Sequence, residues 1–594
     1  MHKIYPHIFP VLLLLALEIQ NAPLLASNPV AFVINCALIY LPLMILISVI
    51  GKVFPAGLAA SLILLTFYTV SFYRHSQTGQ VLIPIDLNFT RHLKSMAAFS
   101  NLTFSWRSFI SIICVGLINV PMYFCSKHIC PNIKKRGVVF AVSGVIMSML
   151  FFMPFSDNIL PALNFQDAAE LTYNELYESR GALFGFYTVA MAGEVGEPAT
   201  YGLPYMERLV NRVRRNMKPA AKGKAVNPDV IIVMSEAFWD PAKLPNVTFS
   251  EDPVPNYRRL KDQVTSGNLL SPVFGGLTSN TEFELLTGSA MRFAAYGQIP
   301  YYKGDVYVDR DEGRALPSMF GKNGYRTVGL HTYTGAFFDR YLHYPKLGFD
   351  EFIAAEDIKN PLIKGEFHGQ EIIADEYFCD KLLSILDDNA LENPDQPLFI
   401  FGITMQNHTP YLADKYKETH IKADSGGILT YEDTASLEAY LEGVHDADAV
   451  LGRLYDYVQG TERPTIVVYF GDHLPFLTQI TGVYAELGYV EARALEDLTT
   501  EELYKMYTTP YLAFANYTDL PDTWGDISPY YLGALTADAA GIRKNLYYEF
   551  LIQAFESFQA MNEDLYIADG EVSAELPEVS TALTMFEAFQ YDKL

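Results

Sequence analysis

Long, uniformly apolar stretches dominate the first 160 residues of the chain, and a different pattern follows them. Five stretches each hold about 20 consecutive, mainly apolar residues. A helix of that length crosses a hydrocarbon core of roughly 30 Å at 1.5 Å per residue. We therefore expect a membrane domain over residues 1–155 with five transmembrane α-helices. These lie at residues 6–25, 30–50, 54–73, 106–125 and 137–155.

The loops between these stretches predict their orientation. Segment 126–136, between the fourth and fifth stretches, holds four Lys and Arg residues and is the most basic turn of the chain. The positive-inside rule places such a loop in the cytoplasm. An odd number of spans then puts everything after residue 155 outside the cell. The loop at 74–105 opposes this topology, because it would also lie outside and yet holds three basic residues.

From residue 226 onward, short β-rich runs alternate with helical patterns, notably at 370–386 and 436–458. Alternating strands and helices are typical of a mostly parallel central sheet with helices on both faces. We expect such an α/β domain over residues 226–545. Its predicted strands lie at 230–234, 326–330, 398–403, 465–470 and 511–515.

Two further segments flank this domain. Residues 156–225 form a linker with interfacial helices, in which 205–217 is a basic amphipathic helix with four arginines. Such a helix either lies on an anionic membrane surface or is an ordinary connector. Residues 546–594 are acidic and form either a covering helix or a loose tail.

Charge separates the two parts of the chain further. Residues 1–160 carry 10 Lys and Arg against 3 Asp and Glu, whereas the rest carries 33 against 65. A soluble part with a net charge of about −32 repels phosphate backbones, so nucleic acid is excluded as a partner. That part holds a single cysteine, Cys379, and therefore no internal disulfide.

Candidate metal ligands follow two of the predicted strands. Glu236 comes shortly after the run 230–234, and Asp472 and His473 end the run 465–471. Open α/β sheets bind ligands at the carboxyl ends of their strands. Two carboxylates and one imidazole suit Mg²⁺ or Mn²⁺ and, less well, Zn²⁺. Each residue also has an ordinary interpretation, as a helix-capping acid or an exposed histidine.

A third candidate lies in the stretch 274–286, where a Gly-Gly turn leads through Thr278 into an apolar-periodic helix. A helix N-terminus offers unpaired N–H groups and a positive dipole end to a phosphate. Beside a metal ion, a threonine hydroxyl becomes a nucleophile. The alternative is a plain capping box in which a Ser or Thr pairs with Glu282 or Glu284.

Together these residues resemble the lipoteichoic acid synthase family in order and spacing. That family comprises membrane phosphoglycerol transferases with a sulfatase-like ectodomain of the alkaline phosphatase superfamily, preceded by five membrane spans. The resemblance implies that Glu236, Thr278, Asp472 and His473 bind one manganese or magnesium ion. It also implies that Thr278 is the catalytic nucleophile.

The resemblance extends to a substrate pocket. His331 follows the run 326–330, and Arg340 comes nine residues later, as in the family. The stretch 401–411 resembles the family strand that ends in Asn-His-Thr-Pro, which implies that His408 lies beside the transferred glycerol phosphate. Phe338 stands where the family has Trp, so an aromatic wall is kept while the indole N–H donor is lost.

The implied reaction moves phosphoglycerol from phosphatidylglycerol to an acceptor through a phosphothreonine intermediate. The acceptor is a glycolipid, a growing polyglycerolphosphate chain or a glucan, so the product builds or decorates a cell-envelope glycerophosphate polymer. Arg340 and the helix N-terminus balance the phosphoryl charge, and His408 shuttles protons. The protein is then a multi-pass enzyme of the cell membrane with an extracellular catalytic domain.

Other functions compete with this one. A phosphoethanolamine transferase shares the fold and topology, but that family has a disulfide-rich ectodomain. A sulfatase needs a Cys/Ser-x-Pro-x-Arg motif, which Ser279 does not provide, and a two-metal phosphodiesterase needs a second ligand set. A non-enzyme alternative is an envelope binding or signalling module on a degenerate fold, against which the intact ligand set argues.

Overall fold

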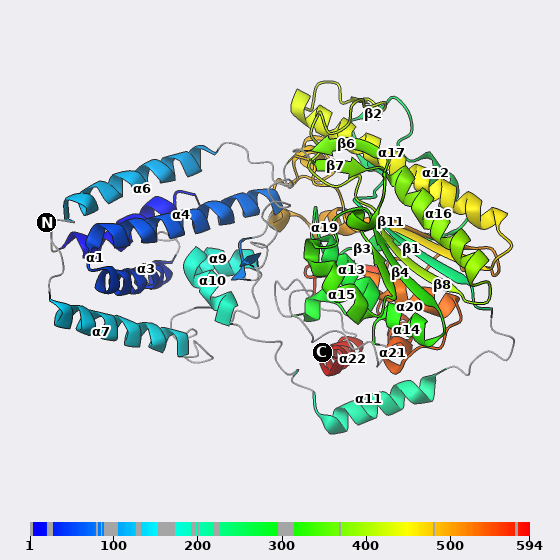
Figure 1. The fold of residues 1–594 in the computed structure, drawn as a ribbon, viewed down its shortest axis with the longest axis horizontal. Coiled ribbons are helices and arrows are strands. Elements are labelled where there is room, and N and C mark those ends of the chain that lie inside the picture. The colour runs from blue at the N-terminus through cyan, green and yellow to red at the C-terminus, as the bar shows by residue number, and fades with distance from the viewer. Residues whose placement is uncertain are drawn as a thin grey trace. The chain divides into compact units, whose positions relative to one another are not determined.

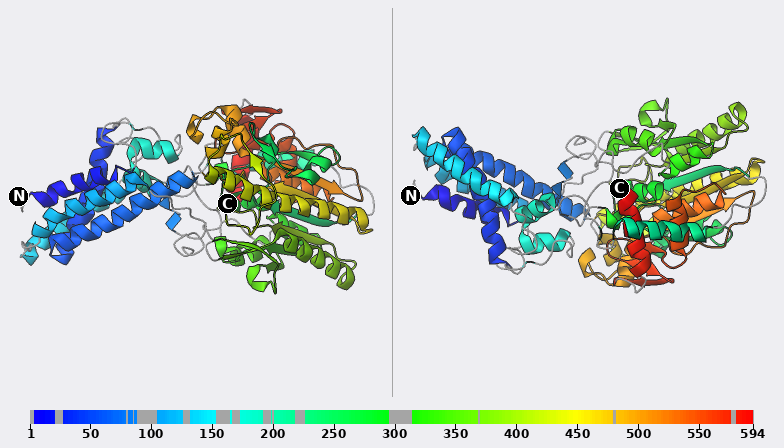
Figure 2. Two further views of the ribbon diagram at one scale, coloured as in Figure 1. Left: turned by 90° about the horizontal axis from the view of Figure 1, so that it is seen from above. Right: turned by 90° about the horizontal axis from the view of Figure 1, so that it is seen from below.

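The structure is a computed structural model and describes most of the chain. Two compact units make it up, residues 1–87 with 101–194 and residues 88–100 with 195–594, and each is described by itself (Figures 1 and 2). Residues 21–25, 85, 88–104, 126–131 and 153–155, which belong to expected spans and loops, lie outside the described part. The described residues are 4–20, 28–78, 81–84, 86–87, 105–125, 132–152, 165, 173–191, 198, 201–217, 226–294, 314–367, 370–478, 481–575 and 580–593.

The first unit is helical. Within the described residues, three segments are long and apolar enough to cross a membrane: Pro29–Ile50, Val53–Ser76 and Trp106–Phe124. The apolar helix α1 has only 13 residues, so a membrane domain of five spans stays a prediction. The helices are α1 (Tyr5–Leu17), α3 (Pro29–Ile50), α4 (Val53–Thr78), α6 (Trp106–Cys125), α7 (Ile133–Phe152), α9 (Tyr173–Arg180) and α10 (Ala182–Met191).

Helix α10 is joined to the candidate span α3 by buried hydrogen bonds. The Asn35 side chain of α3 donates to the carbonyl of Arg180 at 2.7 Å and accepts from the backbone N–H of Phe184 at 3.1 Å. Asn35 is fully buried, so these bonds satisfy a polar group that would be costly to leave unpaired. Helices α9 and α10 therefore pack on the apolar helix α3 within the first unit.

The second unit is built on a seven-stranded sheet in the order β3-β11-β10-β1-β8-β4-β5. Five neighbouring strands, from β10 to β5, run parallel, whereas β11 and β3 are antiparallel to their neighbours. The expectation of a mostly parallel sheet is confirmed. The strands are β1 (Asp229–Ser235), β3 (Thr265–Leu270), β4 (Arg326–His331), β5 (Glu351–Ile353), β8 (Leu398–Ile403), β10 (Thr465–Gly471) and β11 (Thr508–Ala515).

Both faces of the sheet are buried, as alternate residues of β1 show. Ile231 and Val233 pack in one core with α16 and α17, and Ile232 and Met234 pack in a second core with α13, α14, α20 and α21. A strand buried on both faces needs a continuous apolar run, which is what β1 has. The helices include α12 (Pro255–Leu260), α13 (Thr278–Thr287), α14 (Leu316–Lys322), α15 (Arg340–Leu347), α16 (Asp375–Glu392), α17 (Tyr431–Gly460), α18 (Gly482–Glu486), α19 (Thr500–Tyr507), α20 (Pro529–Ala539) and α21 (Leu546–Phe555).

The strands and helices depart from the sequence prediction at three places. Strands β3 and β5 are additional, and residues 370–373 form a strand rather than the start of a helix. That strand, β7 (Gln370–Ile373), pairs with β6 (Ile363–Phe367) in a hairpin. The remaining small strands are β2 (Thr248–Phe249), β9 (Ala423–Asp424), β12 (Ala560–Met561), β13 (Tyr566–Ala568) and β14 (Glu571–Ser573).

The two segments that flank the expected catalytic domain both pack on its core. Helix α11 (Leu203–Asn216) buries Met206, Leu209 and Val213, and helix α22 (Ser580–Lys593) buries Phe586 and Phe589. Of the two alternatives for the end of the chain, the covering helix is therefore observed for residues 580–593.

Candidate active site

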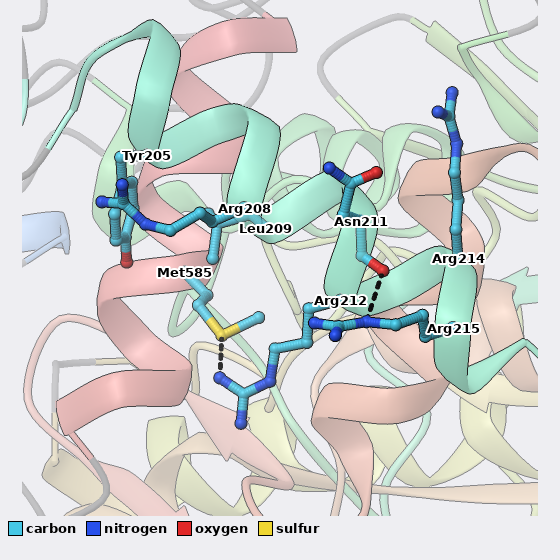
Figure 3. A pocket seen from close by; sticks show the side chains of 8 residues that line it. All are labelled: Tyr205, Arg208, Leu209, Asn211, Arg212, Arg214, Arg215 and Met585. Carbon is cyan, nitrogen blue, oxygen red and sulfur yellow. Dashed lines mark hydrogen bonds between the residues drawn. The ribbon is translucent and has the colours of Figure 1, made fainter.

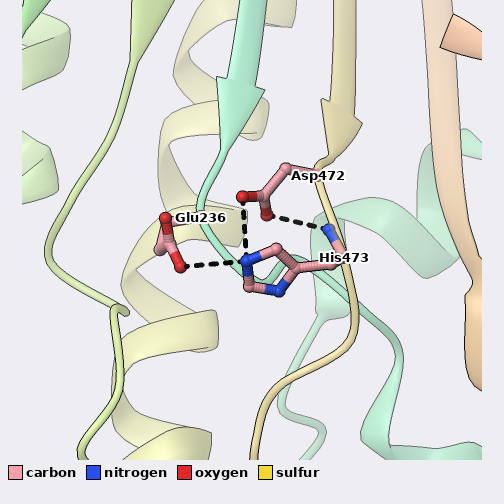
Figure 4. Close-up of side chains that lie close together, drawn as sticks. All are labelled: Glu236, Asp472 and His473. Carbon is pink, nitrogen blue, oxygen red and sulfur yellow. Dashed lines mark hydrogen bonds and ion pairs between the residues drawn. The ribbon is translucent and has the colours of Figure 1, made fainter. Parts of the chain in front are cut away.

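Strands β1 and β10 bring the predicted metal ligands together. They are parallel neighbours, and their last residues, Ser235 and Gly471, lie opposite each other. Glu236 and Asp472, which follow directly, are therefore adjacent, and His473 completes the group (Figure 4). One ligand atom from each of these three buried side chains lies within 4.8 Å of the others.

Backbone contacts fix the two loops that carry these ligands. The Glu236 N–H donates to Oγ1 of Thr404 at 3.0 Å, and the Ala237 N–H donates to Oδ1 of Asp472 at 2.8 Å. Oδ1 of Asp472 also accepts from the His473 N–H at 2.9 Å. Its other oxygen, Oδ2, is buried and accepts no hydrogen bond. One oxygen of Asp472 thus orders the loop, and the other faces the group.

Gly471 permits this close approach of the two loops. A Cβ at this position would lie 2.0 Å from the carbonyl oxygen of Phe238, closer than any side chain tolerates. The glycine that ends β10 therefore lets the loop after β1 pass directly over it. This contact sets where Asp472 begins.

The tautomer of His473 follows from its contacts. Its Nδ1 lies 2.9 Å from the carbonyl oxygen of Leu474, which can only accept, so Nδ1 carries the proton. Nε2 faces Oδ2 of Asp472 at 3.2 Å and Oε1 of Glu236 at 3.6 Å. In the neutral ring Nε2 carries a lone pair, and this lone pair points at two carboxylates. A cation between the three groups would offset the repulsion among them.

These residues fit a divalent cation. A buried carboxylate oxygen without a hydrogen bond, a second carboxylate and an imidazole with a backbone-fixed tautomer form a typical ligand set. Burial and, next, the charge of Asp472 raise the pKa of Glu236 well above its usual range. A cation at this position would offset that repulsion. Glu236, Asp472 and His473 are the residues that would hold it.

Thr278 lies against this group, as expected, at the first position of α13. Its hydroxyl donates to Oε2 of Glu236 at 3.3 Å and lies 3.4 Å from Nε2 of His473. The preceding residue, Leu277, has a left-handed conformation with φ 60°, which costs a non-glycine residue about 1–3 kcal/mol. This turn presents the hydroxyl to the ligands. No side chain caps α13, so the capping-box interpretation of this stretch is wrong.

A second buried group surrounds Arg340. Its Nε and Nη2 both donate to Oε2 of Glu282, at 3.0 and 2.8 Å, and Tyr344 donates to Oε1 of Glu282 at 2.8 Å. Glu282 and Arg340 are 0% and 1% exposed, so this is a fully buried ion pair. Sequence reasoning missed the partnership, because Glu282 was interpreted as a local helix cap.

His331 and Phe338 border the same guanidinium. Nη1 of Arg340 lies 3.3 Å from Nε2 of His331, and its Cζ lies 5.2 Å from the centre of the Phe338 ring. Burial and the charge of Arg340 lower the pKa of His331 well below its usual range, so the ring is neutral and Nε2 accepts. The guanidinium fork is thus engaged by Glu282, and Nη1 is the nitrogen that faces the histidine.

Helix α13 connects the two groups. Thr278 and Glu282 are four residues apart and therefore lie on one face of the helix, one turn from each other. The charges of Lys415 and, less strongly, Arg340 lower the pKa of Glu236 and offset part of the effect of burial. Nucleophile candidate and arginine clamp are thus positioned by a single rigid element.

His408 lies near both groups, and a buried lysine that the sequence did not reveal holds its loop. Burial, and next the charges of Lys415, His473 and Arg340, lower the pKa of His408 to about 3. Lys415 is 0% exposed, donates to the carbonyl oxygen of His408 and contacts the rings of Tyr411 and Tyr416. A lysine in a polar loop carries no sequence signal for such burial.

Comparison with known proteins identifies the family. The family model for sulfatases matches residues 228–542, which include every candidate residue described above and more than half of the chain. The chain belongs to the sulfatase family. The expectation of an enzyme of the sulfatase-like superfamily is thus confirmed.

Solved structures agree on the fold of this sulfatase-family chain. The structure of the phosphoglycerol transferase GacH from Streptococcus pyogenes, in complex with sn-glycerol-1-phosphate, superposes with a TM-score of 0.51. The two sequences are 22% identical, and the match covers 67% of this chain and 95% of the other. At this identity the similarity establishes the fold alone.

Two relatives of the sulfatase-family chain come from Rhizobium meliloti (strain 1021). The chain is 32% identical over 425 residues to a putative cyclic β-1,2-glucan modification protein of Rhizobium meliloti (strain 1021), a match that covers 71% of this chain. It is 27% identical over 252 residues to the capsular polysaccharide biosynthesis protein RkpI of the same organism. The chain spans 62% and 42% of the lengths of these two relatives.

Proposed function

We propose that the protein is a metal-dependent phosphoglycerol transferase with phosphatidylglycerol as donor, Thr278 as nucleophile and an envelope glucan as acceptor. The observation that carries this proposal is the position of Thr278. Its hydroxyl lies within hydrogen-bond distance of Glu236, at a helix N-terminus, beside a carboxylate–imidazole group that fits a cation. The resemblance of the sequence to lipoteichoic acid synthases supports the donor, and the glucan-modification relative supports the acceptor.

In the first step, Oγ of Thr278 forms a bond to the phosphorus of phosphatidylglycerol. The bond from phosphorus to the diacylglycerol oxygen breaks, and that oxygen leaves with a proton. Glu236 accepts the hydrogen bond of the Thr278 hydroxyl and so orients it towards the phosphorus. A bound Mn²⁺ or Mg²⁺ ion would supply positive charge that favours the deprotonated hydroxyl and the developing phosphoryl charge.

In the second step, an acceptor hydroxyl attacks the phosphothreonine, and Oγ of Thr278 leaves. We assign the transfer of the acceptor's proton to His408: its Nδ1 lies against the carbonyl oxygen of Thr409, so Nε2 is the nitrogen that receives the proton and passes it to the departing Thr278 oxygen. The N–H groups at the start of α13 and Nη1 of Arg340 face the phosphoryl charge in this proposal. In this proposal Arg340 binds the phosphate through Nη1 alone, since its Nε and Nη2 are bound to Glu282.

We place the reaction at the outer surface of the cell membrane, where the five predicted spans would hold the site near the donor headgroups. The membrane helices, the extracellular side and the single metal ion belong to this proposal. The physical reason for such an anchor is that the donor lipid is confined to the same surface.

The test is to incubate the purified full chain with Mn²⁺ and phosphatidylglycerol labelled in its headgroup. We expect release of diacylglycerol and a glycerophosphate adduct on Thr278, found by mass spectrometry. Thr278→Ala abolishes both, whereas Ser279→Ala does not, because the buried Ser279 hydroxyl has no hydrogen-bond partner to lose.

Two outcomes contradict the proposal. Adduct formation with phosphatidylethanolamine alone identifies a phosphoethanolamine transferase instead. Undiminished cellular function of Thr278→Ala identifies a non-catalytic envelope module.

A further inference from the structure

Helix α11 turns its apolar face to the protein and its arginines to the outside. Met206, Leu209 and Val213 are buried in the core of the second unit, against α21 and α22. The apolar face is therefore not available to lie in a membrane, although the sequence pattern alone allows it. The four arginines lie outside this apolar stripe and are exposed: Arg208, Arg212, Arg214 and Arg215.

These arginines line a hollow over α11 and α22 (Figure 3). Its volume is about 910 Å³, within the range of roughly 300–1,000 Å³ of small-molecule sites. Arg208, Arg212 and Arg215 follow one another at spacings of four and three residues, so they form one stripe on the helix. Met585 of α22 and Tyr205 supply apolar walls.

The partners of these arginines are neutral. Arg212 donates to the thioether of Met585 at 3.4 Å, which is a weak acceptor, and Arg215 donates to the carbonyl of Asn211 at 3.2 Å. Arg208 lies over the ring of Tyr205 at 5.8 Å. Across the described part of the chain, no carboxylate forms an ion pair with any of the four. The arginine charges of the hollow are thus outside the ion pairs of the described residues.

The positive charge of α11 contrasts with the negative net charge of the rest of the domain. The soluble part of the chain has a large acidic excess, and α11 itself contains one acid, Glu207, against the four arginines. Arginine binds phosphate through two parallel N–H groups, whereas carboxylates repel it. An anionic phosphate ester is therefore the ligand that this hollow is suited to.

The chain connectivity favours a membrane lipid as the source of that phosphate. Only residues 192–202 separate α11 from α10, and α10 is hydrogen-bonded to the candidate span α3. Basic residues close in sequence to a membrane span attract anionic headgroups. We propose that the arginine hollow of α11 and α22 binds the headgroups of anionic phospholipids. This site is distinct from Thr278 and does not depend on the proposed function.

The test uses the full chain in a neutral detergent, with lipid binding followed by native mass spectrometry. The probe is phosphatidylserine, an anionic lipid that is not the proposed donor, and phosphatidylcholine is the zwitterionic comparison. Arg212→Gln/Arg215→Gln is expected to weaken phosphatidylserine binding at least about tenfold and to leave phosphatidylcholine binding unchanged. Lys359→Gln/Lys417→Gln removes the same charge from exposed sites elsewhere and should bind like the unmodified chain.

Equal phosphatidylserine binding by the two double variants overturns the proposal. Displacement of the lipid by inorganic phosphate at equal concentration also overturns it, because the hollow is then a site for free phosphate. Thr278→Ala provides the link to the proposed function. It should keep full phosphatidylserine binding, so failure of either proposal is recognised separately.

Discussion

Two buried acidic groups meet α13 one helical turn apart, one at Thr278 and the other at Glu282, and their charges are balanced in different ways. Glu282 is neutralised by Arg340 and Tyr344, and each of its oxygens accepts a hydrogen bond. Glu236 and Asp472 instead face each other and Nε2 of His473, and the charges of Lys415 and Arg340 offset only part of the effect of burial and of Asp472 on Glu236. The first group is balanced by its own ion pair, whereas the second holds two close carboxylates that a bound cation would balance. Incomplete charge balance, rather than burial, distinguishes a binding site from a structural pair here.

The largest expected effect comes from breaking the ligand group. Asp472→Asn keeps the oxygen that accepts from Ala237 and His473 and removes the charge of the other oxygen. We expect transferase activity to fall at least roughly 10³-fold, as for loss of a central electrostatic catalyst. Without metal, the melting temperature should stay the same or rise, because a buried repulsion is relieved. A lower melting temperature in the absence of metal contradicts this comparison.

Breaking the complete group has the opposite effect on stability. Glu282→Gln leaves the buried Arg340 without its counter-charge, which costs about 3–5 kcal/mol of unfolding free energy. Denaturant unfolding of the full chain in detergent measures this loss. Glu351→Gln is the matched control, since its pair with Arg326 is 2.7 Å long but 29% and 45% exposed. The control should lose no more than about 1 kcal/mol.

The pH dependence sharpens the contrast. Burial and the charge of Asp472 raise the pKa of Glu236, so the folded chain binds this proton more tightly than the unfolded chain does. Stability from this group is therefore present at low pH and is lost as pH rises from the ordinary carboxyl pKa to the raised value. Mn²⁺ would bind the deprotonated carboxylate and so restore the stability that is lost as pH rises.

We accordingly expect the increase in melting temperature on adding Mn²⁺ to grow as pH rises above the ordinary carboxyl pKa. In Asp472→Asn the increase should be small and nearly independent of pH. Thermal unfolding followed by tryptophan fluorescence measures both. An increase of the same size in both proteins contradicts binding of Mn²⁺ at this group.

The smallest effect concerns the aromatic wall beside Arg340. Phe338→Leu removes the ring that lies 5.2 Å from the guanidinium, whereas Phe337→Leu removes a neighbouring buried ring of the same size. The first substitution should cost about 0.5–2 kcal/mol more unfolding free energy than the second, which is the range of a cation–π contact. Equal losses would show that the Phe338 ring acts by packing alone.

The sequence predicted the elements that carry local signals. Strand β1 and strand β10 are continuous apolar runs that end on polar residues, so both the strands and the position of Glu236 and Asp472 could be inferred. Strand β3 has the sequence TSGNLL and lies at the sheet edge. Three of its six residues are only partly buried, so this strand does not need a continuous apolar run. It therefore carries no strand signal.

The misinterpreted residues share one physical cause. Glu282 satisfies the local pattern of a helix cap, but its partner Arg340 is 58 residues away in the chain. Lys415 is buried by rings and a carbonyl that fold around it, and nothing in its own segment indicates this. Long-range charge pairing and burial of polar loops are tertiary effects that a local pattern does not contain.

The turn of α13 between Thr278 and Glu282 fixes the angle between these two side chains around the helix axis. Each residue of an α-helix advances by about 100°, so one residue inserted in this turn would rotate Thr278 away from Glu236 or Glu282 away from Arg340. No side-chain adjustment restores both contacts, because each partner is anchored to a different strand or helix of the unit. The length of this turn is therefore under tighter constraint than the identity of any residue within it, and insertions here should be the least tolerated in the domain.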